Sequence, residues 1–186
     1  MPDRRKIQTK IQMKSLTHYI QEKLVIKKSN KKYLPETKEE LRAIIEERIK
    51  DKGNEVDLND IDVSNIKDMS YLFAHTNFNG DISKWDVSHV TNMRDMFCMC
   101  YEFNQDISGW GVSNVTNMND MFDGCVIFNK DISNWDVSKV QTMYGMFYGC
   151  GDFNQDISKW DISNLKYTVG MFEHCKIEEK YKPKLK

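Results

Sequence analysis

The chain has 186 residues, which is enough for one domain with a core and too few for two domains of ordinary size. Apolar residues make up 40% and charged residues 30%, and no apolar run approaches the roughly 18 residues that span a bilayer. The basic N-terminal stretch has no apolar core of the kind found in secretory signals. We therefore expect a cytoplasmic protein, with the cell surface or a virion as the alternative location.

The formal net charge of −1 is unevenly distributed along the chain. Residues 1–56 carry 15 Lys/Arg against 9 Asp/Glu, residues 57–176 carry 8 against 17, and the last ten carry 4 against 2. An acidic body between basic ends is not the single basic face of a nucleic-acid-binding protein. Binding of nucleic acid is not expected, and the basic N-terminal segment is its only candidate.

The first predicted domain, residues 1–56, is a basic leader followed by a helical cap. Thr37 and Glu40 have the spacing of a capping box, and Gly53 is a typical helix end. Between them an apolar face is expected from Leu41, Ile44, Ile45 and Ile49. A second short helix is predicted over residues 16–24. We interpret the cap helix as a lid on the domain that follows.

The second predicted domain, residues 57–176, is built from a repeat. Three kinds of residue recur with a period of 25, namely Trp85, Trp110, Trp135 and Trp160; Phe78, Phe103, Phe128 and Phe153; and Cys100, Cys125, Cys150 and Cys175. A degenerate unit, with Ile61 in place of tryptophan, comes before them. Repeats of this length are typical of proteins in which neighbouring units stack to share one core. Residues 177–186 form a basic C-terminal tail.

Each unit is predicted to contain one short strand and one short helix. In the second unit the inward positions are Ile82, Trp85, Val87, Val90, Met93, Met96, Phe97, Cys100 and Phe103. The alternation at residues 85–87 favours a strand, and the i, i+3, i+4, i+7 spacing at residues 93–100 favours one or two helical turns. The predicted fold is therefore an α/β repeat, a leucine-rich-repeat-like solenoid of about five coils with an N-terminal helical cap.

The repeat, written FNxDISxWDVSxVTxMxxMFxGC, resembles the BspA-like leucine-rich-repeat family of bacterial surface proteins over about two-thirds of the chain. The segment preceding the repeats, from Tyr33 to Ile66, also resembles the corresponding segment of that family. The resemblance implies adhesion or protein–protein contact.

The recurring cysteines and aspartates each allow two interpretations. In stacked units, cysteines 25 residues apart could approach disulfide distance. Because they lie on the predicted inward face, we expect them instead to be buried free thiols. Cys98 points outward in this scheme and is the thiol expected to react. Columns of aspartate, such as Asp81 and Asp106 with their equivalents, either bind calcium or accept turn amides within their own unit. No cysteine and histidine spacing is typical of zinc, so no metal site is predicted.

Catalysis is not predicted. The four histidines fall at unrelated points of the repeat, and the recurring serines mark architecture. No cofactor and no small-molecule substrate are expected.

The candidate binding site is the outward side of the predicted strands, where the repeat varies. In the third unit Gly109 and Gly111 flank Trp110 and leave a bare notch, although drift in a degenerate repeat explains them equally well. The candidate partner-binding residues are Lys84, Asp86, His89, Gly109, Gly111, Asn114, Asn134, Asp136 and Lys139.

These features favour a non-catalytic protein–protein interaction module that presents one face to a protein partner. An intracellular inhibitor or adaptor from a phage or mobile element fits this description. The alternative is a structural or adhesive repeat protein of a surface or virion. Thr168 and Gly170 weaken the last predicted helix, so self-association through the C-terminal unit is a further expectation.

Overall fold

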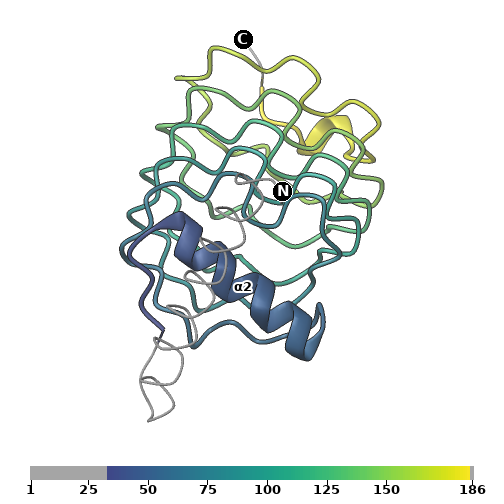
Figure 1. The fold of residues 1–186 in the computed structure, drawn as a ribbon. Helices are drawn as coiled ribbons and strands as arrows, with labels where there is room; N and C mark the ends of the chain where they lie inside the picture. The colour runs from purple at the N-terminus through teal and green to yellow at the C-terminus, as the bar shows by residue number, and fades with distance from the viewer. Residues whose placement is uncertain (1–32, 185–186) are drawn as a thin grey trace, which may run out of the picture. The chain divides into compact units, whose positions relative to one another are not determined.

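The computed structural model describes residues 33–184, and all of these except Tyr33 belong to one compact unit, Leu34–Lys186. The predicted helix over residues 16–24 lies outside the described residues. In Figure 1 the described chain begins with helix α2 (Lys38–Lys52), winds through successive repeats that lie side by side, and ends near the 3-10 helix η1 (Glu179–Tyr181). None of the described helices has the length and apolar character needed to cross a membrane.

Helix α2 begins and ends where the sequence predicts. The Thr37 side chain accepts a hydrogen bond from the Glu40 amide at 3.1 Å, while the Glu40 carboxylate accepts one from the Glu36 amide at 3.0 Å. The Gly53 amide donates to the Ile49 carbonyl, and the φ of Gly53 is +84°, a conformation that favours glycine. Leu41 and Ile45 are buried, so the predicted apolar face packs inward.

Neighbouring repeats are joined by rows of main-chain hydrogen bonds. The rows link five segments that we call ladder segments, residues 68–75, 92–99, 117–124, 142–149 and 167–174. In the second of them the amides of Met93, Asp95, Phe97 and Met99 donate to Asn117, Asn119, Met121 and Asp123 of the third, at 2.7–3.0 Å. The other junctions repeat this pattern with equivalent residues.

The predicted α/β solenoid of about five coils, with a strand and a helix in each, is wrong. Among the described residues α2 is the only α-helix, and strand structure is limited to single bridges such as Asp68 with Asn92 and Asn92 with Asn117. No sheet forms within residues 33–184. Residues 85–87, where a strand was expected, lie between two turns, closed by hydrogen bonds from the Trp85 amide to the Ile82 carbonyl and from the Val90 amide to the Val87 carbonyl.

Left-handed backbone explains why the apolar pattern does not produce helices. Each ladder segment contains two residues with positive φ, four positions apart, for example Asp95 (+54°) and Met99 (+56°). Such residues interrupt a right-handed helix. Successive amides therefore do not all bond within one helix. The Met96 amide donates to the Met93 carbonyl three residues back, and the next amide, that of Phe97, donates to the Met121 carbonyl in the following repeat.

The core is nevertheless the predicted one. Every inward position listed above for the second unit is buried. Phe73, Phe97, Phe122, Phe147 and Phe172 form a column of stacked rings with centroids 5.4–5.8 Å apart. The Trp110 indole Nε1 donates to the Ile82 carbonyl of the previous repeat at 3.2 Å, and the other tryptophans do the same. The tryptophan and phenylalanine periods therefore record contacts between neighbouring repeats.

Candidate functional site

The predicted notch is bare and exposed in the structure. A Cβ added at Gly109 would meet nothing within 4 Å, and at Gly111 the nearest atom would be the Ser88 Cβ at 3.5 Å. Lys84 and Asn134 are also exposed, and their side chains form no hydrogen bond or ion pair with the described residues. The structure places these four residues on the surface without assembling them into a shaped site.

The other predicted site residues use their polar atoms in contacts within the chain, either in a turn of their own repeat or with the neighbouring repeat. Asp86 and Asp136 accept the amides of Ser88 and Ser138 at 3.0 and 3.1 Å. The His89 Nε2 lies 3.1 Å from the carbonyl oxygens of both Val63 and Ile66 in the preceding repeat.

Asn114 and Lys139 are brought together. The Lys139 Nζ donates to the Asn114 Oδ1 at 2.8 Å, and the Asn114 Nδ2 donates to the Ser88 carbonyl at 2.8 Å. A partner at this face would have to compete with these internal contacts.

The aspartate columns are explained by turns. Each carboxylate accepts the amide two residues ahead, as Asp106 does from Ser108 at 2.9 Å. Hydrogen bonds from that serine lower the pKa of Asp106, and the same cause lowers the pKa of Asp156. Within residues 33–184 no group of three or more His, Cys, Asp or Glu is arranged to hold a metal ion.

The four cysteines that recur every 25 residues match the expectation of buried free thiols. Cys100, Cys125 and Cys150 are buried and unbridged, and Cys175 is half-buried. The Cys125 thiol donates to the Phe97 carbonyl of the preceding repeat at 3.1 Å.

Cys98 differs from the prediction that it is the reactive thiol. It lies on the outer side of its ladder segment, but only 9% of it is exposed. Burial, reinforced by the carboxylates of Asp123 and Asp95, raises the pKa of Cys98 to about 12. The reactive thiolate is therefore strongly disfavoured.

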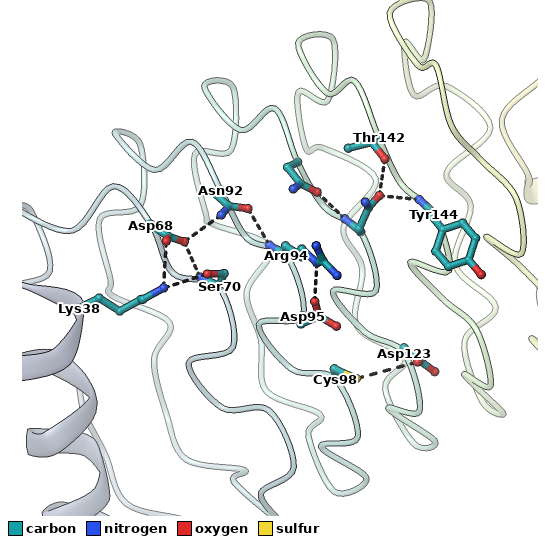
Figure 2. Close-up of polar contacts among 12 residues, drawn as sticks. Lys38, Asp68, Ser70, Asn92, Arg94, Asp95, Cys98, Asp123, Thr142 and Tyr144 are labelled. Carbon is teal, nitrogen blue, oxygen red and sulfur yellow. Dashed lines mark hydrogen bonds and ion pairs between the residues drawn. The ribbon is translucent and has the colours of Figure 1, made fainter.

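A different surface gathers the side chains typical of binding sites. It is the outer side of the ladder segments, which we call the tyrosine face. Its members are Tyr71, Arg94, Asp95, Asp120, Asp123, Tyr144 and Tyr148. Tyr71, Tyr144 and Tyr148 are 43%, 49% and 38% exposed. Figure 2 shows Arg94, Asp95 and Asp123 on neighbouring segments, with Tyr144 further along the stack.

Contacts make this face continuous across the repeats. The Arg94 guanidinium lies 5.9 Å from the centre of the Tyr71 ring, and its Nε donates to Asp95 at 2.8 Å. Asp120 lies directly against Gly145, because a Cβ at Gly145 would stand 2.3 Å from the Asp120 Oδ1. The backbone at Gly145 has a φ of +57°, so glycine suits the position for two reasons.

The three carboxylates of the tyrosine face crowd one another. Burial and the charges of Asp95 and Asp123 raise the pKa of Asp120 to about 6. Burial and Asp95 also raise the pKa of Asp123. The Asp123 Oδ1 is buried and has no hydrogen-bond partner among the described residues, while its Oδ2 accepts from the Cys98 thiol at 3.9 Å.

This arrangement can attract a cation. Arg94 is the basic residue within the cluster, and its Nε is directed to Asp95. A lysine or arginine placed over Asp120 and Asp123 would relieve their repulsion, and the neighbouring tyrosine rings would cover its aliphatic part.

Sequence reasoning missed the tyrosine face because it looked for variation only on the predicted strands. The signal lies in the third and fourth residues of each ladder segment, which in the three middle repeats stand between a methionine and a Met-Phe pair. They read Ser-Tyr, Arg-Asp, Asn-Asp, Tyr-Gly and Val-Gly along the chain, at residues 70–71, 94–95, 119–120, 144–145 and 169–170. These positions vary in an otherwise regular segment, as do residues 74, 98, 123, 148 and 173.

Comparison with known proteins identifies a family. The family model described as "Mycoplasma protein of unknown function, DUF285" matches residues 43–126 and 108–182, well over half of the chain. That family belongs to the BspA-like and Mycoplasma repeat group, which confirms the resemblance at this level. No curated protein and no solved structure matches the chain.

Proposed function

We propose that this chain, which belongs to the DUF285 family of Mycoplasma proteins, is a non-catalytic module that binds another protein through its tyrosine face. The observation that carries the proposal is the combination of exposed tyrosines with crowded carboxylates on adjoining repeats. Tyrosine and arginine are enriched among the residues that dominate protein–protein binding energies.

The electrostatics support a partner with a basic side chain at the contact. Burial and the charge of Asp95 raise the pKa of both Asp120 and Asp123, so keeping these carboxylates ionised costs folding free energy in the isolated chain. Charges held at a cost to stability are typical of functional sites. A cationic partner would recover part of that free energy, so the same residues would provide both affinity and specificity.

The test is affinity capture of the tagged chain from its native lysate, with quantitative mass spectrometry of the captured proteins. Wild type is compared with Asp120→Asn and with Tyr148→Ala. The matched control is Gly109→Arg, which adds a large side chain where a Cβ meets no other atom. A partner that is retained by the control and reduced at least about tenfold by both face variants supports the proposal.

The opposite pattern would contradict it. A partner lost only in Gly109→Arg would place binding at the notch, and equal capture by all four proteins would exclude both faces. Repeating the capture at pH 5 adds an independent check. Asp120 has a pKa of about 6, so it is protonated at pH 5 and the attraction to a basic partner should weaken.

A further inference from the structure

The main-chain hydrogen bonds between ladder segments all run in one direction. At each junction four amides of the earlier repeat donate to four carbonyls of the later one. The amides of the later repeat at equivalent positions then donate onward. Each ladder segment therefore presents carbonyls to the repeat before it and amides to the repeat after it. The two ends of the stack differ: one offers acceptors and the other offers donors.

The donor end is open. In the last ladder segment the amides equivalent to those of the earlier junctions belong to Thr168, Gly170, Phe172 and His174. None of these four has an acceptor within residues 33–184. Tyr167 and Val169, beside them, are 65% and 68% exposed, the highest values among the large apolar residues of the described chain. Rows of unpaired main-chain groups are ready templates for pairing with another chain.

The rest of the last repeat is covered by the residues that follow it. The Ile157 amide donates to the Tyr181 carbonyl at 3.0 Å, and the Lys182 Nζ lies 5.5 Å from the centre of the Phe172 ring. Pro183 is buried. The open part is thus confined to residues 167–174, which we call the donor edge.

A second copy of this chain does not fit the donor edge. Two donor edges facing each other would place amides against amides. The acceptor row of the first repeat, at residues 68–74, lies under helix α2. There the Lys38 Nζ donates to Asp68 and Ser70 at 2.9 Å each, and a cavity of about 250 Å³ between α2 and this row is lined by Lys38, Glu39, Arg42, Ser70, Tyr71 and Leu72. Figure 2 shows α2 beside Asp68 and Ser70 at this end.

We infer that the donor edge binds an extended segment of another protein, which runs parallel to residues 167–174 and supplies carbonyls to the four open amides. The inference extends the proposed function by adding a second contact of different chemistry. The main chain of the partner would give affinity, as in other strand-addition complexes, and Tyr167 and Val169 would select apolar side chains beside it. The four internal junctions show the hydrogen-bond geometry that such a segment would reproduce.

The probe is a synthetic peptide of residues 115–124, whose carbonyls serve as acceptors within the chain itself. It is titrated onto the full-length protein while amide hydrogen exchange is followed residue by residue by NMR. Without peptide, the amides of Thr168, Gly170, Phe172 and His174 should exchange much faster than their bonded equivalents, the amides of Met143, Gly145, Phe147 and Gly149. With peptide at about ten times its Kd, exchange at the four edge amides should slow about tenfold.

Two controls make the result specific. The mirror-image peptide has the same composition but a backbone of opposite hand, so it should give no protection. Thr168→Pro removes one donor and should weaken peptide binding about fivefold, with exchange at residues 143–149 unchanged as evidence that the fold is intact.

Two results would overturn the inference. One is unchanged exchange at the edge amides with millimolar peptide. The other is protection that rises with protein concentration in the absence of peptide, because the occupant would then be a second copy. Asp120→Asn should leave the protection of the edge amides by the peptide unchanged. A negative result in the peptide titration would therefore count against the donor edge alone and not against protein binding by the tyrosine face.

Discussion

Replacing Asp120 by asparagine should stabilise the protein at neutral pH. In the folded chain burial and the neighbouring carboxylates of Asp95 and Asp123 raise the pKa of Asp120 from 3.8 to about 6. The folded state therefore binds this proton more tightly than the unfolded state does. The contribution of Asp120 to stability is therefore greatest below pH 4, falls as the pH rises toward 6, and remains reduced above that.

The magnitude follows from the same numbers. A rise from 3.8 to about 6 corresponds to about 3 kcal/mol at full value. Asp120 is partly exposed, and solvent screening reduces the expected cost to about 1–2 kcal/mol. Asparagine keeps the shape of the side chain and carries no charge, so it should recover that amount at pH 7.5 and almost nothing at pH 4.

Urea unfolding of wild type and Asp120→Asn between pH 4 and 8 measures this difference directly. Glu102→Gln, at an exposed position outside the tyrosine face, removes the same charge and serves as the control. The reasoning is refuted if Asp120→Asn is no more stable than wild type at pH 7.5, or if its gain is the same at every pH.

Three further predictions concern single residues. Trp110→Phe removes the indole donor to the Ile82 carbonyl, which keeps the Trp85 amide, so the free energy of unfolding should fall by about 1 kcal/mol in urea titrations; an unchanged value would show that this bond contributes nothing. Gly145→Ala places a Cβ against the Asp120 carboxylate at a position with left-handed backbone, so the free energy of unfolding should fall by about 2 kcal/mol in the same titrations. As a control, Gly109→Ala should change it by no more than about 0.5 kcal/mol. Burial raises the pKa of Cys98 to about 12 in the folded protein. At pH 8 this thiol should therefore react with iodoacetamide at least about a hundredfold more slowly in folded protein than in urea-unfolded protein. Rapid labelling of Cys98 in the folded protein would contradict the buried environment.

Much of the packing could be predicted from the repeat, but the hydrogen bonding could not. The apolar spacing at Met93, Met96, Phe97 and Cys100 correctly identifies four inward side chains. The same spacing suits a helix and a series of tight turns, because both return a side chain to one side every three to four residues. Left-handed residues such as Asp95 and Met99 decide between them. Neither is a glycine, and the equivalent positions become glycine only in later repeats, at Gly124, Gly145, Gly149 and Gly170, so the sequence signals this backbone in only part of the repeat.

Helix α2 could be predicted because its signals are local. A capping threonine, an acidic residue three positions later and a final glycine act within one turn of each end. The candidate site could not be found in this way. Asp95 becomes a neighbour of Asp120 and Asp123 only when the repeats lie against one another, and the crowding of the three carboxylates depends on that arrangement.

The proposal that the tyrosine face binds a protein is tested most directly by photo-crosslinking. Tyr144 is replaced by p-benzoylphenylalanine, which retains an exposed aromatic ring at this position, and Lys159, exposed and outside the tyrosine face, is replaced in the same way as the control. Irradiation in the native lysate should join the Tyr144 variant to one protein, with loss of the product when Asp120→Asn is added. Equal crosslinking from both positions, or products that are insensitive to Asp120→Asn, would contradict binding through the tyrosine face.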